Sequence, residues 1–205
     1  DGLDIFQDVV AYVVLLIALL LFHAAFTYSL FLKIVGGLNP LTFFRKMKDV
    51  ALFAFSTSSS AATIPVTLKT TNQDLGVNQN VASFVVPVGA TINMDGTAIM
   101  QGLATVFIAQ MSGIDLTLFQ YIQVILLAVA TSIGTAAVPS AGTITLIIIL
   151  QQFNLPLEAI GIILAVDRVL DMIRTSVNVT GDAAIACIVA KTENQLDENI
   201  FNSKA

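Results

Sequence analysis

The sequence predicts an all-α polytopic membrane protein, built from inverted repeats with two re-entrant helical hairpins and broken transmembrane helices. Three observations favour this fold class. The 205 residues are 56% hydrophobic and only 11% charged, with a mean hydropathy of +0.87, whereas soluble domains carry about 25% charged residues. Short runs of serine, glycine and proline interrupt several apolar segments. One apolar segment nevertheless carries three carboxylates and an arginine along a single helix face.

Residues 1–40 are predicted to form a transmembrane helix. Residues 9–32 carry no charge and are long enough to span about 30 Å of hydrocarbon. Lysines and arginines follow this segment, from Lys33 to Lys48, so the positive-inside tendency places its C-terminal end in the cytoplasm. For His23, near the middle of the span, we expect packing or hydrogen bonding rather than a proton relay.

A first re-entrant hairpin is predicted over residues 41–76. Its two apolar limbs, residues 41–56 and 64–75, are each about 18–24 Å long as helices, too short to cross a bilayer. The serines Ser58–Ser60 separate the limbs. The first limb carries four charged residues from Arg45 onward, so we expect the hairpin to enter from the cytoplasmic side.

A second hairpin is predicted over residues 117–155. The limbs 118–131 and 143–153 flank a segment rich in serine, glycine and proline, and residues 116–157 contain no charge at all. Non-helical backbone at membrane depth is tolerated only where it is buried in protein or lines a water-filled cavity. The second tip is therefore expected to contribute to a binding site.

A helix with a polar break is predicted after each hairpin. The first covers residues 80–113 and breaks at Asn93–Thr97; the second covers residues 156–190 and carries a similar polar group at Asn178–Asp182. One spanning helix between the hairpins makes the second open outward if the first opens inward. Such inverted-topology repeats are typical of secondary transporters, whose binding sites lie near the membrane midplane.

The helix at residues 156–190 carries a polar stripe that spans an arc of about 100° at helical periodicity. The stripe consists of Asp167, Asp171, Arg174, Thr175, Asn178 and Asp182. Ionisable groups in a bilayer cost about 2.5–3.5 kcal/mol each on insertion scales, and they persist where they face a cavity, a partner charge or a transported ion. A buried ion-pair network that only joins helices is the alternative, but the stripe is long and chemically mixed.

These polar groups suit a ligand with two carboxylates and one amine. Unwinding at Asn93–Thr97 would free carbonyl oxygens beside Asp95 for a monovalent cation. The hairpin tips can direct half-helix N-termini at an anionic group. Arg174 suits a second carboxylate, and Asp171 could bind an ammonium group. Gln101 is expected to bond between helices.

Four motifs resemble those of the dicarboxylate/amino-acid:cation symporter family, which includes the excitatory amino-acid transporters. They are Ser58-Ser59-Ser60 with Pro65, Asn93-Met94-Asp95-Gly96-Thr97, Ser132-Ile133-Gly134-Thr135, and Asp171 to Asp182 with Arg174, Thr175, Asn178 and Gly181. The resemblance covers residues 9–193. It implies that residues 1–40 are similar to the family's sixth helix, that residues 41–190 form a transport core, and that residues 191–205 form a cytoplasmic tail. The chain begins with Asp1 and is expected to be the C-terminal portion of a longer protein.

The resemblance implies a symporter of aspartate, glutamate or related dicarboxylates, coupled to sodium and working by elevator-type alternating access. The implied substrate-binding residues are Ser58, Ser60, Thr97, Val138, Asp171, Arg174, Thr175 and Asn178. The implied ligands of two or three sodium ions are Gly89, Thr91, Asn93, Asp95, Ser132, Ile133, Thr135, Asn178 and Asp182. It implies no catalytic residue and no organic cofactor. It further implies contact with membrane lipid, a homotrimer formed through an N-terminal scaffold, and a multi-pass protein of the plasma (inner) membrane with a cytoplasmic C-terminus.

Three alternatives stay open. Proton-coupled symporters of glutamate or dicarboxylates share much of the same frame. An intramembrane aspartyl protease could pair Asp95 with Asp182, but it would not explain Arg174, and the expected Gly-x-Gly-Asp is replaced by Val179-Thr-Gly-Asp182. A channel is disfavoured because a broken-helix site on inverted repeats suits alternating access. The sequence has no basic stripe for nucleic acid, and its single cysteine excludes an internal disulfide.

Overall fold

The computed structural model describes residues 2–203, with side chains from residue 6 onward, and this part of the chain is helical without a β-strand. The first long helix runs through α1 (Gly2–Phe22), a π-helical segment η1 (His23–Tyr28) and α2 (Ser29–Ile34). Residues 6–34 are the one described segment that is both long and apolar enough to cross a membrane. Most of this segment is exposed, so its apolar side chains face outward.

Helices α3 (Pro40–Thr57) and α4 (Ser60–Gln73) form hairpin 1. The Asn39 side chain accepts hydrogen bonds from the first turn of α3, a strong N-cap, and Ser58, the residue that follows α3, has a left-handed conformation with φ 50°. Ser59 then caps α4 by accepting from Ala62 N. The second limb therefore begins at Ser60, four residues before the expected start, because the serine tip initiates the helix itself.

Helices α5 (Gln79–Ile92) and α6 (Asp95–Met111) are separated by two non-helical residues. Asn93 and Met94 have ψ angles of 75° and 51°, which interrupt the helix inside the segment where the sequence predicts a break. The first helical bond of α6 is Ala98 N to Met94 O, so the N–H groups of Asp95, Gly96 and Thr97 are left without a helical acceptor.

Hairpin 2 consists of α7 (Leu118–Ile133), α8 (Ala141–Gln152) and the tip at residues 134–140 between them. A capping box between Thr117 and Gln120 starts α7. At the other end of the tip, Ser140 adopts a left-handed conformation with φ 58°. The short turn η2 (Leu157–Ala159) leads on to the last long helix.

Helix α9 (Ile160–Thr192) is one uninterrupted helix of 33 residues. The polar break expected at Asn178–Asp182 is therefore wrong. Its Gly181 marks a close approach instead, since a Cβ there would lie 2.5 Å from the Tyr28 hydroxyl oxygen and 2.6 Å from Asn93 Nδ2. Packing against these neighbours outweighs the weak helix propensity of glycine, which costs only about 1 kcal/mol.

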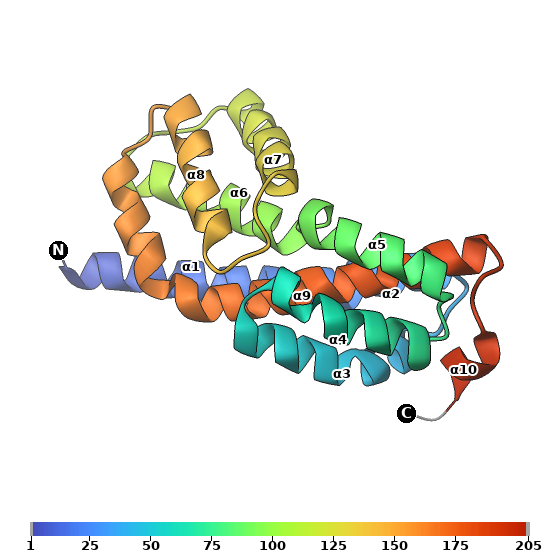
Figure 1. Ribbon diagram of the computed structural model, residues 1–205. Helices are drawn as coiled ribbons and strands as arrows, with labels where there is room; N and C mark the ends of the chain where they lie inside the picture. Colours follow the sequence, from blue (N-terminus) through green and yellow to red (C-terminus); the bar gives the residue numbers. More distant parts are fainter. Residues whose placement is uncertain (1, 204–205) are drawn as a thin grey trace.

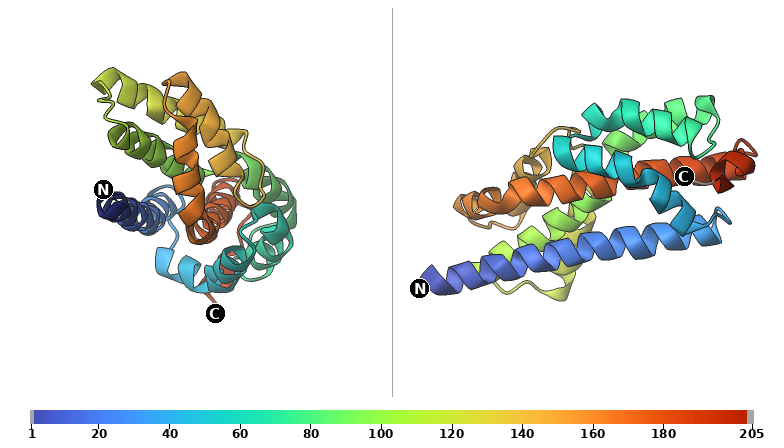
Figure 2. Two further views of the ribbon diagram at one scale, coloured as in Figure 1. Left: turned by 90° about the vertical axis from the view of Figure 1, so that its left-hand side faces the viewer. Right: turned by 90° about the horizontal axis from the view of Figure 1, so that it is seen from below.

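Helix α9 is the centre of the molecule, packing against α1, α3, α4, α5, α6 and α8. The open end of hairpin 1 lies near α10 (Glu198–Asn202), at the right of Figure 1, whereas hairpin 2 opens toward the top of the view, and both tips reach the middle of α9. Figure 2 shows α1 beside α9, with both helices running in the same direction. The re-entrant placement and the inverted repeats stay predictions.

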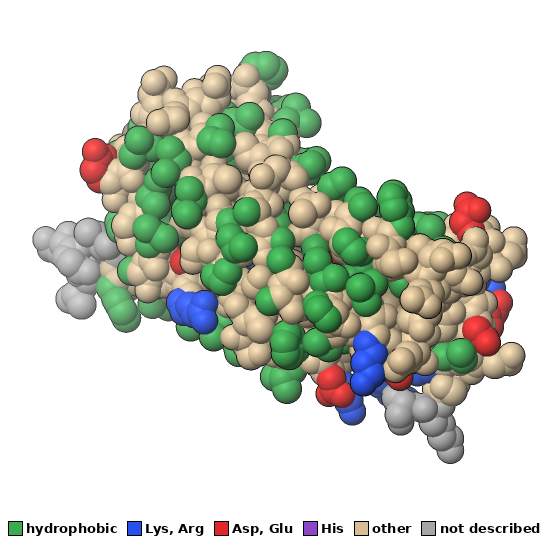
Figure 3. Space-filling view, viewed as in Figure 1, with side chains coloured by type: hydrophobic (Ala, Val, Ile, Leu, Met, Phe, Trp, Pro, Cys, Tyr) green, Lys and Arg blue, Asp and Glu red, His purple; other side chains and the backbone are tan. Residues whose placement is uncertain are grey.

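The outer surface is strongly apolar. Hydrophobic side chains are spread over the face in Figure 3, including the region of α7 and α8, whereas most charged side chains gather near the right-hand end. On hairpin 2, Leu118, Phe119 and Leu126 are each at least 65% exposed. Contiguous exposed apolar area of this kind marks a surface that another apolar phase or protein covers.

Candidate functional site

The two hairpin tips meet directly over α9. Ser59 Oγ and Ala61 N both donate to the backbone carbonyl of Ala137, at 2.9 Å and 3.2 Å. The other end of the hairpin 2 tip is fastened to α9, because Ser140 N donates to Asp171 Oδ2 at 2.8 Å. The two hairpin tips, which are more than seventy residues apart in sequence, thus enclose the part of the polar stripe around Asp171.

A small cavity of about 20 Å³ lies where the tips meet. Its lining consists of Ser58, Met94, Thr97, Thr135, Ala136, Ala137, Val138, Gly142, Asp171, Arg174, Thr175 and Asn178. Of the eight predicted substrate-binding residues, Ser60 alone is not part of this lining; it is buried in the first turn of α4. The space holds about one water molecule, so an amino acid cannot enter until a tip moves.

Arg174 is buried and folds back along its own helix. Its Nη2 lies 2.5 Å from Asp171 Oδ1 and 3.4 Å from Asp167 Oδ1, and all three side chains are almost fully enclosed. Side chains on a helix point toward its N-terminus, which explains why Arg174 reaches residues three and seven positions earlier. Its Nη1 has no hydrogen-bond partner. One guanidinium therefore faces two carboxylates, and its Nη1 donors are available to a further partner.

Asn178 joins the start of α6 to α9. Its Oδ1 accepts from Gly96 N at 2.8 Å, and its Nδ2 donates to Thr97 Oγ1 at 3.3 Å. One N–H group left free by the break in α5–α6 is thereby satisfied by a side chain. A Cβ at position 96 would lie 3.0 Å from Asn178 Oδ1 and 3.1 Å from the Arg174 side chain, so glycine permits this close approach.

Four of the predicted cation ligands lie together where the C-terminal end of α5 and the following Asn93 meet α9. Asp182 Oδ1 accepts from Asn93 Nδ2 at 2.9 Å, and the same amide lies 3.4 Å from Asn178 O. A Cβ at Gly89 would lie 2.6 Å from Asp182 Oδ1, so the carboxylate sits directly on the α5 backbone. This donor set is made of hard carbonyl and carboxylate oxygens, which suit a monovalent cation.

The described residues contain no group of three or more histidine, cysteine, aspartate or glutamate side chains that could hold a metal ion. Helix α5, which carries Thr91, packs against α7, which carries Ser132 and Ile133. Thr91 is exposed and its hydroxyl donates to Val88 O. Thr135 lines the cavity between the tips, and its hydroxyl bonds Thr145. The metal roles of these residues stay predictions.

The side chain of Asp95 hydrogen bonds the π segment of the first helix. Its Oδ2 is 3.1 Å from His23 Nε2 and 3.2 Å from the Tyr28 hydroxyl. His23 therefore forms a hydrogen bond, as expected, and its exclusion as a proton relay stays a prediction. The sequence contains no signal for the role of Tyr28, because the partners are 67 positions apart and an isolated tyrosine in an apolar run is ordinary packing.

Gln101 connects α6 to both limbs of hairpin 2, as an interhelical residue should. This fully buried amide donates to Gly142 O at 3.0 Å and to Thr145 Oγ1 at 2.7 Å, and it accepts from Thr131 Oγ1 at 2.8 Å. An amide with three partners in a dry interior is strongly held. The limbs of hairpin 2 are thus tied to α6 close to the tip, because Thr131 lies in the last turn of α7 and Gly142 and Thr145 lie at the start of α8.

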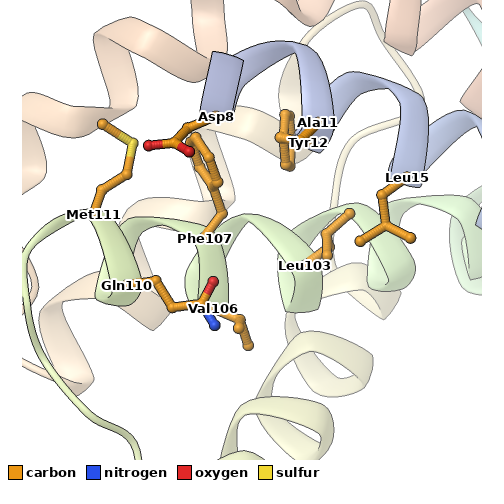
Figure 4. Close-up of a pocket in the computed structure, with 9 residues that line it drawn as sticks. All are labelled: Asp8, Ala11, Tyr12, Leu15, Leu103, Val106, Phe107, Gln110 and Met111. Carbon is orange, nitrogen blue, oxygen red and sulfur yellow. The ribbon is translucent and has the colours of Figure 1, made fainter. Parts of the chain in front are cut away.

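A larger cavity of about 380 Å³ lies between α1 and α6 (Figure 4). Its wall is mainly apolar, and Asp8 and Gln110 are its most polar members. It contains no residue of the polar stripe. The convergence of polar groups, rather than cavity size, therefore identifies the candidate site under the hairpin tips.

Comparison with known proteins finds related sequences over most of this chain. Residues 1–192 match the model of the sodium:dicarboxylate symporter family. The chain is 42% identical over 189 residues to an excitatory amino acid transporter of Caenorhabditis elegans, covering 92% of this chain and 38% of that protein. It is 44% identical to human excitatory amino acid transporter 2 (87% and 31% covered) and 43% identical to mouse excitatory amino acid transporter 3 (98% and 39%). The chain thus spans less than half the length of these relatives.

Proposed function

This chain belongs to the sodium:dicarboxylate symporter family, and we propose that it forms the substrate- and ion-binding core of a sodium-coupled symporter for acidic amino acids. The observation that carries the proposal is the position of Arg174. It is a buried guanidinium with an unpartnered Nη1, at the one place where both hairpin tips meet α9. The printed names of the relatives, excitatory amino acid transporters, support the same substrate class.

In the proposed bound state, Arg174 leaves Asp171 and pairs with the side-chain carboxylate of aspartate or glutamate. Charge-assisted bidentate pairs of this kind are short and strong. Asp171, with Thr175 beside it, then becomes free to accept the substrate amino group. Asn178, Ser60 and the tip backbones near Ser58 and Val138 hold the α-carboxylate. Thr97 on α6 faces Arg174 on α9 across the site.

Sodium is proposed to bind at separate sites around this ligand. One ion uses Asp182 with the carbonyls of Gly89, Asn93 and Asn178. A second lies beneath hairpin 2 on carbonyls of Thr91, Ser132, Ile133 and Thr135. A third uses Asp95 and Asn93 with a helix outside this chain. Because the sites share elements with the substrate site, each ligand's affinity depends on the others through one coupling free energy.

The mechanism we propose is elevator-type alternating access. The core, residues 41–190, moves relative to a scaffold outside this chain, and hairpin 2 acts as the outer gate. The two hairpins open in different directions away from their touching tips in Figure 1, which supports an inverted arrangement. The exposed apolar faces of α1 and α7 support contact with lipid or scaffold. A plasma-membrane location, a trimer formed through the scaffold and a cytoplasmic C-terminus complete the proposal.

Uptake of radiolabelled L-aspartate or L-glutamate into proteoliposomes tests the proposal. The full-length protein should concentrate the substrate when a sodium gradient alone is imposed, and uptake should saturate. Accumulation driven only by a proton gradient would instead support the proton-coupled alternative. Flux that neither saturates nor runs against a gradient would indicate a channel and contradict the proposal.

A further inference from the structure

The first long helix contacts Asp95 through a local change of helix type. His23 and Tyr28 are the first and last residues of the π segment, and both hydrogen bond the same atom, Asp95 Oδ2. We call these two residues the Asp95 clamp. No other described residue hydrogen bonds Asp95 through its side chain, so the first helix supplies every such partner.

The π segment is what brings the clamp together. Five residues of α-helix would turn the side-chain direction by about 140° beyond a full turn. In a π-helix the hydrogen bond runs from i to i+5, and its wider turn brings residues five apart nearer to the same side of the helix. His23 and Tyr28 accordingly pack with ring centroids 4.9 Å apart at 76°. Single π turns in α-helices are often found at functional sites.

Tyr28 also reaches α9. Its hydroxyl lies 3.2 Å from Val177 O, in addition to Asp95 Oδ2. The hydroxyl occupies the notch at Gly181, where any Cβ would lie 2.5 Å away. The buried side chain of Tyr28 therefore joins the first helix to α6 and to α9. The hydroxyl fits at this place because Gly181 on α9 has no side chain.

The clamp leaves one side of the carboxylate free. Both hydrogen bonds end on Asp95 Oδ2, and no described residue bonds Oδ1. A carboxylate has about four acceptor positions on its two oxygens, so a cation on Oδ1 does not compete with the clamp for the same atom. Holding Oδ2 fixes the direction in which Oδ1 points.

We propose that Tyr28 is a positioning residue for cation binding at Asp95, acting by holding Asp95 Oδ2 against α9 so that Oδ1 is presented to the ion. The inference rests on the proposed function for the presence of a coupled cation. Residues that hydrogen bond an ion's ligand and fix its direction are a general feature of ion sites, and their loss commonly lowers affinity about 10–100-fold. Tyr28 is not itself a ligand of the ion or the substrate.

The test compares two tyrosines on the same long helix. Tyr28→Phe removes the hydroxyl and keeps the ring. Tyr12→Phe is the matched control, because the buried Tyr12 hydroxyl has no hydrogen-bond partner and its ring packs on Phe107 in the cavity of Figure 4. The measurement is thermal stabilisation of the purified full-length protein by sodium, lithium, potassium or choline chloride at fixed pH.

Tyr28→Phe should raise the half-saturating concentration of the stabilising cation roughly tenfold, the change expected from one hydrogen bond to a charged group. Tyr12→Phe should leave it unchanged. Aspartate affinity at saturating cation should be the same in both variants, which a general loss of structure would not produce.

Gly181→Ala gives a second variant, whose Cβ would approach both the Tyr28 hydroxyl and Asn93 Nδ2. Because this Cβ would displace the Tyr28 hydroxyl, the substitution should weaken cation binding, as Tyr28→Phe does. In the Tyr28→Phe background the same substitution should cost less, since the hydroxyl is already absent; such non-additivity is the mark of coupled residues. Strict additivity would overturn the proposed position of Tyr28.

The outcomes separate the clamp from sodium coupling. Equal effects of Tyr28→Phe and Tyr12→Phe, in a protein that sodium stabilises, overturn the clamp and leave the proposed function standing. Stabilisation by potassium alone, weakened by Tyr28→Phe, supports the clamp and overturns sodium as the coupled ion. A protein that none of these cations stabilises overturns both.

Discussion

The guanidinium of Arg174 lies 2.5 Å from the carboxylate of Asp171, one turn earlier on the same buried helix face. In the closed arrangement of the tips, the group proposed to recognise the substrate carboxylate and the group proposed to recognise its amine therefore neutralise each other. Breaking such a buried pair without replacement costs about 3–5 kcal/mol. A ligand that offers both a carboxylate and an ammonium group replaces both halves at once, which favours zwitterionic acidic amino acids over simple dicarboxylates.

Substitution of Arg174 tests substrate recognition. Arg174→Cys should lose at least about 100-fold in L-aspartate affinity, the scale of a charge-assisted hydrogen-bonded pair. The affinity for neutral amino acids should rise relative to the affinity for acidic ones. Arg168→Cys, an exposed arginine on the same helix, is the control. Competition binding on the purified full-length protein measures both, and unchanged aspartate affinity in Arg174→Cys would refute the assignment.

Asp182 tests ion coupling. Asp182→Asn removes the charge while keeping an oxygen near Asn93 and Gly89, so sodium should bind at least about tenfold more weakly. Substrate affinity at low sodium should fall with it, since coupling between sites is reciprocal. Asp115→Asn, in an exposed loop, should behave like the wild type. Aspartate titrations at several sodium concentrations measure this coupling. If the aspartate affinity of Asp182→Asn depends on sodium as fully as that of the wild type, the assignment of this site is wrong.

The contact between Ser59 and Ala137 makes the tips a measurable gate. Spin labels at the exposed residues Ala62 and Ala136 should report a short distance with sodium plus aspartate and a longer, broader one with sodium alone. A second pair, Leu52 with Ala62, lies within hairpin 1 and should not change. Pulsed electron paramagnetic resonance gives both distributions. Identical Ala62–Ala136 distances in the two conditions would exclude hairpin 2 as the substrate-linked gate.

Lys46 tests how hairpin 1 is held at its open end. Its buried ammonium donates to Asp74 O at 2.8 Å, Ile200 O at 2.6 Å and Ser203 Oγ at 3.2 Å. Lys46→Met keeps the aliphatic stem and removes these bonds, so it should destabilise the protein by about 1–3 kcal/mol. Lys48→Met, at an exposed position, is the control. Equal apparent melting temperatures for the two variants would show that the ammonium contributes nothing.

Local chemistry explains which features could be predicted. The interruption at Asn93–Met94 was visible because polar residues and a glycine stand inside an apolar segment. The stripe from Asp167 to Asp182 was visible because helical periodicity alone places those residues on one face. The same reasoning failed at Gly181, where a similar polar group looks like a break. There the helix continues, because the glycine makes room for side chains from elsewhere.

Long-range contacts could not be predicted from the sequence. An apolar helix such as α1 has no periodic pattern that would mark a π turn at His23, and nothing in the sequence pairs Tyr28 with Asp95. The pairing of Ser59 with Ala137 likewise depends on how two separate hairpins are packed. The folding of Arg174 onto Asp171 follows from spacing on the helix, but the closed tips that enclose the pair do not.

The most direct measurement is a cryo-electron microscopy map of the full-length protein with saturating sodium and L-aspartate. The account predicts ligand density between the hairpin tips and α9. Arg174 should have turned from Asp171 to the ligand side-chain carboxylate, and Asp171 should contact the amino group. Ligand density away from the tips, or an Arg174–Asp171 pair that persists beside a bound ligand, would contradict the account.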